Sequence, residues 1–266
     1  MTTTQRVIKY CAIALAIFLI AGIIGTIACI IDGTTYIFGG KPSEEMQNMD
    51  ISGEIKSLDI DIIASRLEIK KGSDFALESN ANITAEVKNG VLKITEKRKL
   101  FSGYGAGEVI LSVPENFAFE EVKIENGAGK FTADNIYTHV LKMDFGAGKA
   151  DIGYITAIRS AKIDCGAGQF TISGSAMANL DFDMGAGEVN IQSRLMGDCK
   201  IDCGVGAMNL RLVGMADDYT LELDKGLGDI FIDGKKTDEG TYGTGADKVE
   251  IDGGVGSINI SFTNYK

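Results

Sequence analysis

The sequence has little of several residue types on which catalytic and binding sites commonly depend. Tryptophan is absent from the 266 residues, proline occurs twice, and the single histidine is His139. We expect His139 in a solvated loop between repeat units, where it is a poor candidate for a catalytic base. No Cys and His spacing typical of zinc sites is present. Lysine and arginine number 26 against 37 acidic residues, and this acidic balance argues against a nucleic-acid partner, which requires a basic surface.

The five cysteines are odd in number, and their positions do not predict a disulfide framework. Cys11 and Cys29 lie in an apolar N-terminal run. Cys165 and Cys203 occupy inward positions of strands that we expect two solenoid turns apart, roughly 10 Å, which is beyond the reach of a disulfide. With Cys199 they are interpreted as small buried hydrophobic residues. The sequence indicates no cofactor and identifies no small-molecule substrate.

Glycine, by contrast, is abundant, with 34 residues, and much of it falls in one repeated motif, Gly-x-Gly. The copies follow one another at steps of about 19 to 22 residues, except for a last step of about 28. A fixed period of this length is typical of repeat architectures. The glycines of the motif, which we interpret as structural corners, are Gly127, Gly129, Gly146, Gly148, Gly166, Gly168, Gly185, Gly187, Gly204, Gly206, Gly226, Gly228, Gly254 and Gly256.

Alternating apolar residues flank every motif and predict strands on both sides of it. Val122 and Ile124 precede the first motif, and Phe131 and Ala133 follow it. Such period-two alternation is typical of half-buried strands. The inward parity slips by one across the motif, and a glycine there can adopt positive φ or a bulge without a Cβ penalty. A phosphate-binding loop would need a helix after the glycines, whereas here a strand follows each time.

Residues 1–31 are predicted to be a membrane anchor. The uncharged run Tyr10–Ile31 is about 33 Å long as a helix, enough to span a bilayer. It is longer than the apolar region of a cleaved signal peptide, and lipidation at Cys29 is a weaker alternative. Arg6 and Lys9 precede the run, so the positive-inside rule places the N-terminus in the cytoplasm. We therefore expect a single-pass protein of the cell membrane with its C-terminal domain extracytoplasmic.

The rest of the chain is predicted to be a linker and one domain. Residues 32–50 contain Gly, Pro and polar residues without periodicity, as in a linker. Residues 51–266 form the predicted β-solenoid, in which 51–121 are irregular N-terminal coils or a cap and 122–266 are regular repeats. The predicted fold class is all-β, a parallel β-helix or β-solenoid of ~20-residue Gly-x-Gly coils, preceded by one N-terminal transmembrane helix.

The segment Val113-Pro114-Glu115-Asn116, followed by Glu121–Gly129 and the later Gly-x-Gly units, resembles the bacterial DUF4097-type adhesin family of β-strand repeats. The resemblance covers roughly residues 55–262. It implies a β-solenoid that is often membrane-anchored, with some relatives associated with cell-envelope stress responses. It carries no catalytic residues to this chain.

One outward position, two residues before the first glycine of each motif, is acidic throughout. Stacked carboxylates repel one another, so another interaction must compensate for the repulsion along this row. Neighbouring lysines and backbone N–H groups at the corners are the favoured explanation. Calcium binding by Asp164, Asp183 and Asp202 is a weaker one, and polysaccharide cleavage the weakest, because acid–base catalysis needs carboxylates in unlike environments. The acidic row consists of Glu125, Asp144, Asp164, Asp183, Asp202, Asp224 and Asp252.

These observations predict a non-catalytic surface interaction module, adhesin-like or associated with envelope stress. No nucleophile, base and orienting group come together in the sequence. The expected partners are the membrane, through residues 10–31, and an unidentified envelope component or protein. The alternative is a carbohydrate-active β-helix enzyme, a lyase or hydrolase acting on an envelope polysaccharide.

Overall fold

The computed structural model describes residues 45–97 and 107–264. The predicted transmembrane helix and most of the predicted linker lie outside the described residues. Within the described ranges, no helix has the length and hydropathy needed to cross a membrane. The strands are β1 (Gln47–Met49), β2 (Ser57–Ile62), β3 (Arg66–Gly72), β4 (Ala76–Ser79), β5 (Ile83–Lys88), β6 (Val91–Glu96), β7 (Glu108–Pro114), β8 (Ala118–Ala178), β9 (Leu180–Met196), β10 (Asp198–Val213), β11 (Tyr219–Asp224), β12 (Asp229–Ile232), β13 (Lys235–Thr237), β14 (Gly240–Tyr242), β15 (Asp247–Asp252) and β16 (Val255–Thr263), with a 3₁₀ turn at Ala216–Asp218.

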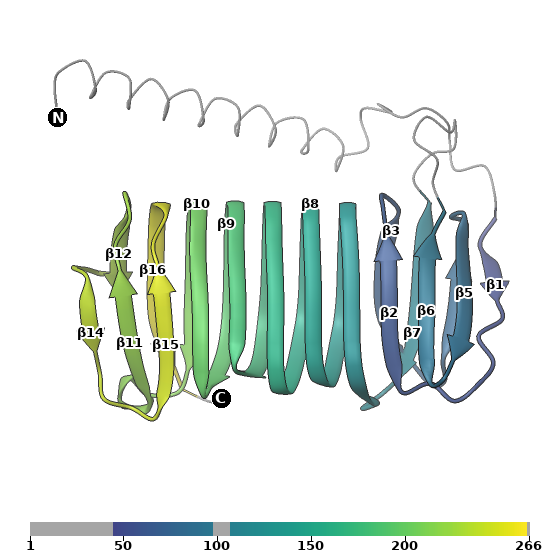
Figure 1. Ribbon diagram of the computed structural model, residues 1–266, viewed down its shortest axis with the longest axis horizontal. Helices are drawn as coiled ribbons and strands as arrows, with labels where there is room; N and C mark the ends of the chain where they lie inside the picture. The colour runs from purple at the N-terminus through teal and green to yellow at the C-terminus, as the bar shows by residue number, and fades with distance from the viewer. Residues whose placement is uncertain (1–44, 98–106, 265–266) are drawn as a thin grey trace, which may run out of the picture.

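The strands wind into a parallel β-solenoid, which confirms the predicted all-β fold (Figure 1). In each coil the chain runs along a first face, turns at the Gly-x-Gly corner, returns along a second face and crosses a lower edge. Equivalent residues of successive coils pair in parallel, as Ile163 does with Phe182 and Phe182 with Ile201. Strand β8 passes through several coils without a break. The predicted loop between units is therefore strand, and His139 lies half-buried in β8 rather than in a solvated loop.

The repeat alone suggests that the coils stack in sequence order. At the two ends of the solenoid they do not. Strand β15 lies between β10 and β11, although β11 precedes it in the chain. At the other end β2 lies between β6 and β8. The long last step between motifs arises because β13 and β14 are inserted there.

Antiparallel strands close both ends of the solenoid. Strands β4 and β5 pair with β7 and β6 at one end, and β13 and β14 pair with β12 and β11 at the other. The irregular N-terminal section is thus both coils and cap. Strand β1 pairs with β4, so the last residues of the segment predicted as a linker belong to the fold.

The core is a set of apolar ladders that run along the solenoid axis. The inward residues of the first face, such as Val122 and Leu141, are fully buried, as are many of the second face. Four phenylalanines form one such stack, with ring centroids 5.4, 5.4 and 5.8 Å apart between Phe131, Phe145, Phe170 and Phe182. Because burial of one such side chain contributes about 1.5–3 kcal/mol, each coil adds stability only when a neighbour covers its inward residues.

The corners need glycine for two reasons. Except at Gly228, the second glycine of the motif has positive φ, for example +144° at Gly148, in the region that side chains rarely adopt. The coils also approach so closely that a Cβ at Gly148 would overlap the carbonyl oxygen of Gly129, and a Cβ at Gly146 would overlap that of Gly127. The first glycine, whose φ is not positive, is thus required by the neighbouring coil. The sequence had suggested only the conformational reason.

Candidate functional site: the faces of the solenoid

The predicted acidic row forms one continuous line on the first face. Asp164 pairs in register with Asp183, and Asp183 with Asp202. The line then continues to Asp252 and ends at Asp224, because the last coils are exchanged. The three predicted calcium candidates are therefore neighbours, as the repeat suggested. Their side chains are between 37% and 47% exposed.

Lysines on the adjacent outward row offset the repulsion between these carboxylates. Lys162 Nζ lies 3.5 Å from Asp164, 3.0 Å from Asp181 and 3.7 Å from Asp183. Lys200 likewise lies 3.1 Å from Asp202 and 3.5 Å from Asp252. The predicted hydrogen bonds from backbone N–H groups at the corners are not found: in the described ranges, no backbone N–H donates to the carboxylates of the three calcium candidates.

The carboxylates nevertheless have unequal environments. Partial burial, a hydrogen bond with Asp164 and the charges of Asp164 and Asp181 raise the pKa of Asp183, with Lys162 opposing. The pKa of Asp202 is lowered because hydrogen bonds with Lys200 and Asp252 outweigh its partial burial. The difference arises where the lysine row is interrupted by Asp181. The expectation that every coil gives an identical environment is therefore wrong.

No group of three or more His, Cys, Asp or Glu side chains in the described part of the chain is arranged to hold a metal ion. The carboxylates of the row are spaced along the face with lysine ammonium groups between them. Calcium binding by Asp164, Asp183 and Asp202 stays a prediction.

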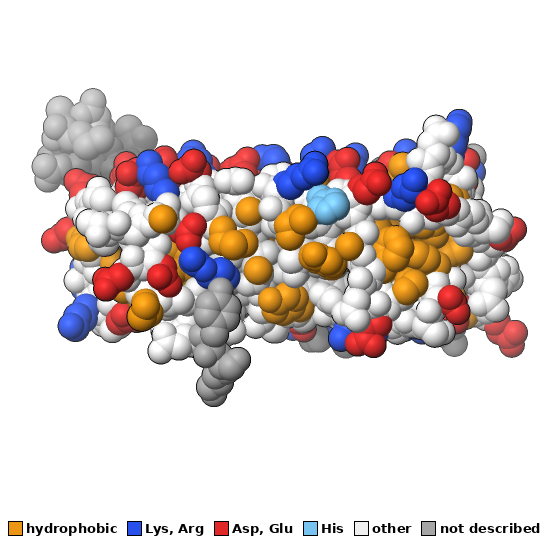
Figure 2. Space-filling model, turned by 90° about the horizontal axis from the view of Figure 1, so that it is seen from below, with side chains coloured by type: hydrophobic (Ala, Val, Ile, Leu, Met, Phe, Trp, Pro, Cys, Tyr) orange, Lys and Arg blue, Asp and Glu red, His pale blue; other side chains and the backbone are white. Residues whose placement is uncertain are grey.

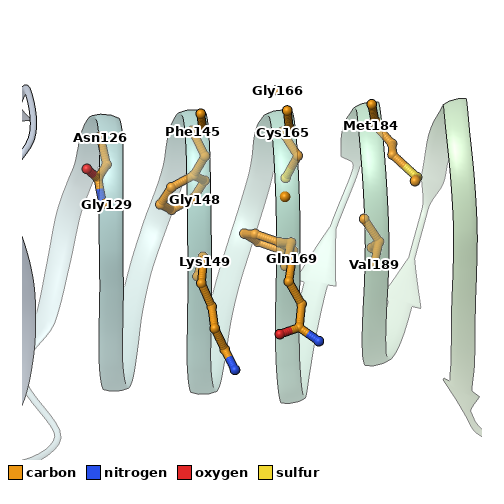
Figure 3. A pocket seen from close by; sticks show the side chains of 16 residues that line it. Asn126, Gly129, Phe145, Gly148, Lys149, Cys165, Gly166, Gln169, Met184 and Val189 are labelled. Atoms are coloured by element: carbon orange, nitrogen blue, oxygen red, sulfur yellow. The ribbon is translucent and has the colours of Figure 1, made fainter. Parts of the chain in front are cut away.

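A small cavity lies inside the solenoid, just beneath the corners (Figure 3). Its volume is ≈ 30 Å³, and Phe145, Cys165, Met184 and Asn126 are among the residues that line it. Asn126 is almost fully buried, and its Oδ1 has no hydrogen-bond partner. A space of this size holds a water molecule or two, so the cavity is not a site for a larger ligand.

The buried cysteines are free thiols. Cys165, Cys199 and Cys203 form no disulfide, and the register places Met184 between Cys165 and Cys203. Burial raises the pKa of Cys203 to about 12 and also raises that of Cys165. Both therefore stay protonated and poorly nucleophilic near neutral pH.

The second face carries a ladder of asparagines that the sequence analysis missed. Asn209 Nδ2 donates to Asn190 Oδ1 at 2.8 Å, and Asn259 Nδ2 donates to Asn209 Oδ1 at 3.0 Å. A shallow hollow of ≈ 520 Å³ lies over them and over Gln192 and Arg211. The signal was present in the sequence, since each asparagine stands five residues after the first glycine of its motif.

Hydrophobic side chains gather along the lower edge, opposite the corners (Figure 2). Tyr137, Tyr154 and Ile158 are 36%, 46% and 44% exposed there, and Tyr154 packs across Gly174 of the next coil. Charged side chains gather mainly along the rims on either side of this edge.

The corner of the first coil is capped by a buried glutamate, which was also missed. Here Ile63-Ala64-Ser65 replaces Gly-x-Gly, and the three backbone N–H groups donate to Glu96 Oε2 at 2.8, 2.9 and 3.2 Å. Ser65 Oγ donates to Glu96 Oε1 at 2.8 Å. In the next coil Ala128 N–H donates back to the carbonyl of Ile63, so the corner N–H groups point toward this end of the solenoid. Glu96, at the end of β6 in the adjoining coil, thus accepts the hydrogen bonds that the N–H groups of this corner offer.

The fold and its faces define a class: a capped parallel β-solenoid with long polar faces. The chain belongs to the DUF4097 family, since the family model "Toastrack DUF4097" matches residues 46–261. This confirms the resemblance found in the sequence. No functionally curated protein matches this sequence significantly.

Solved structures of low sequence identity are similar to this chain. A candidate adhesin from Bacteroides fragilis is 15% identical with a TM-score of 0.45, covering 84% of this chain and 100% of its own. A candidate cell adhesion protein from Clostridium sporogenes is 16% identical with a TM-score of 0.40, covering 82% and 99%. A candidate lipid-binding protein from Parabacteroides distasonis is 17% identical with a TM-score of 0.38, covering 81% and 96%.

Proposed function

We propose that the protein is a membrane-anchored, extracytoplasmic interaction module that binds an envelope or surface component without converting it. The observation that carries this proposal is the shape of the solenoid, whose first and second faces repeat the same positions coil after coil. Repetitive faces suit extended or multivalent partners, because weak contacts add along the stack. Family membership agrees with a surface protein of this kind, adhesin-like or part of an envelope stress response.

The membrane attachment in this proposal comes from the sequence. The apolar run Tyr10–Ile31 supplies the anchor, and Arg6 and Lys9 before it set the orientation. The solenoid then stands outside the membrane, joined to it by the predicted linker.

Protease accessibility tests this arrangement. Protease added to intact, wall-stripped cells that make the full-length protein should degrade the solenoid, while a cytoplasmic marker protein stays intact. Lysed cells serve as the control for protease sensitivity, because a folded solenoid could resist cleavage. Degradation only after lysis would reverse the orientation and contradict the proposal.

The alternative, a carbohydrate-active enzyme, has one observation in its favour. The pKa values of Asp183 and Asp202 are shifted in opposite directions, and such a difference between neighbouring carboxylates is a feature of acid–base pairs. However, neither residue lines any of the cavities described above. Release of reducing sugar from envelope polysaccharide by the wild type, abolished in both Asp183→Asn and Asp202→Asn, would favour the enzyme.

A further inference from the structure

Four neighbouring coils of the second face present a hydrogen-bonding surface made mainly of amide and hydroxyl side chains. Thr171, Asn190, Asn209 and Asn259 stand side by side in register along one outward row. A second outward row beside it contains Gln192, Arg211 and Ser261. We call these two rows, with Ser173, the amide platform. All of its members line the hollow of ≈ 520 Å³.

The same outward rows are charged in the N-terminal half of the face. Glu68, Asp134 and Asp151 line a separate hollow there, together with Lys71 and Thr132. In the coils of the platform, amide and hydroxyl side chains therefore take the positions that carboxylates such as Glu68, Asp134 and Asp151 hold in the N-terminal half. Arg211 is the only charged member of the platform, and its Nη1 contacts Gln192 Oε1 at 3.4 Å.

The ladder leaves hydrogen-bonding capacity free at every rung. An asparagine side chain offers two N–H donors and an oxygen with two lone pairs. Asn209 uses one donor toward Asn190 and one lone pair toward Asn259. One donor and one acceptor therefore remain, on a side chain that the ladder already holds in a fixed orientation. This pre-orientation lowers the entropic cost of binding a partner.

The rungs repeat about every 4.8 Å along the solenoid axis, so four of them extend over about 14 Å. This repeat is close to the length of one sugar residue in an extended glycan chain. At the C-terminal end the ladder meets Phe231, which pairs with Asn259 and is half-exposed. An aromatic ring beside hydrogen-bonding side chains suits the apolar face of a sugar ring.

Charge selects among possible occupants. The protein has a net charge of −11, which disfavours anionic polymers, whereas cationic peptides are attracted to the acidic row on the other face. An extended peptide usually pairs with the edge of a sheet rather than lying across its face. From these features we propose that the amide platform binds a neutral, unbranched glycan lying along the solenoid axis. This inference rests on the proposed interaction function and names its ligand class.

Binding of neutral hexasaccharides to the full-length protein tests the inference. The protein is purified in a polyoxyethylene detergent, because a detergent with a sugar head group would compete. Cellohexaose, xylohexaose and N-acetylated chitohexaose are titrated by calorimetry. We expect at least one to bind with a Kd below about 1 mM, and to bind equally at low and high salt because the ligand is uncharged.

Variants locate the site. Changing Asn190, Asn209 and Asn259 together to Ala should weaken binding at least tenfold. A matched control, Thr132→Ala with Asp151→Ala, alters the same outward row outside the platform and should leave binding unchanged. If the asparagine variant loses its β-sheet circular dichroism, Asn259→Ala with Phe231→Ala replaces it, because these residues lie near the exposed end of the ladder.

Two outcomes would overturn the inference. One is that none of the three hexasaccharides binds at about ten times the expected Kd limit, and the other is that the platform variants bind as the wild type does. A parallel titration with hexalysine distinguishes failure of the glycan inference from failure of the proposed interaction function. Salt-sensitive binding of hexalysine without glycan binding would place the interaction on the acidic row and leave the interaction module in place.

Discussion

Replacing Glu96 by Ala should destabilise the N-terminal end of the solenoid more than replacement of any exposed acidic residue. The Glu96 carboxylate accepts hydrogen bonds from Ile63, Ala64 and Ser65 N–H and from the Ser65 hydroxyl. Glu96 is only 6% exposed and Ser65 is fully buried. The variant therefore leaves buried donors without an acceptor, rather than simply removing a favourable contact.

The size of the effect follows from these contacts. A hydrogen bond to a charged group contributes about 1.5–3 kcal/mol, and a buried donor left without a partner costs about 1–3 kcal/mol. Ile63 is 42% exposed, so water can reach part of the corner and reduce the loss. We therefore expect Glu96→Ala to lower the free energy of unfolding by about 3–5 kcal/mol, which is large for one substitution.

Urea unfolding followed by circular dichroism at the β-sheet band measures this effect. Glu86→Ala is the matched control, because Glu86 lies in the same hairpin but is exposed, and it should change stability by less than about 0.5 kcal/mol. Glu96→Gln should fall between the two, since its amide keeps one acceptor oxygen but loses the charge. Equal midpoints for the Glu96→Ala and Glu86→Ala variants would refute the capping argument.

Three further predictions concern the corners, the acidic row and the thiols. Gly148→Ala should lower the free energy of unfolding, measured in urea, by at least about 2 kcal/mol more than Gly234→Ala. Both glycines have positive φ, but a Cβ at Gly148 would overlap a carbonyl oxygen, whereas a Cβ at Gly234 would have no atom within 4 Å. Equal losses of stability would mean that backbone strain alone, and not the neighbouring coil, requires glycine at the corner. The pKa of Asp183 is raised from 3.8 in the folded protein, so its contribution to stability is present at acid pH and is lost as pH rises through the raised value. Asp183→Asn should therefore flatten the fall in melting temperature on the alkaline side of pH 3.8, and an unchanged pH profile would contradict this. In a variant whose two N-terminal cysteines are replaced by serine, Ellman's reagent should not react with the native protein at pH 8, because burial raises the pKa of Cys203 to about 12; rapid native reaction would show an accessible thiol.

The regular part of the fold could be predicted because its signal is local and repeated. The inward residues alternate with period two, and the Gly-x-Gly corners mark where the parity changes. Residues such as Val122 and Phe131 could thus be assigned to the core from their distance to the nearest corner. The acidic row and its lysines followed from the same counting, and the structure places them on one face.

The ends of the solenoid could not be predicted in this way. The exchange of β11 and β15 depends on which backbone edge is left free, and no local pattern records that choice. The role of Glu96 depends on the pairing of β6 with β2, which brings its carboxylate to the N–H groups of a corner more than 30 residues earlier in the chain. The asparagine ladder is visible in the sequence as a shared offset from the motif, but a neutral amide side chain carries neither the charge nor the catalytic chemistry that marks a site in a sequence.

Binding without conversion is the central claim about function, and a single incubation tests it most directly. Full-length protein is mixed with cell envelopes from the organism that makes it. After sedimentation, the bound protein and the soluble saccharide and peptide fragments are measured together. We predict that the protein sediments with the envelopes in a saturable manner and that no fragments are released above the level of envelopes alone. Release of fragments that increases with time and with protein concentration would contradict the claim and identify an enzyme.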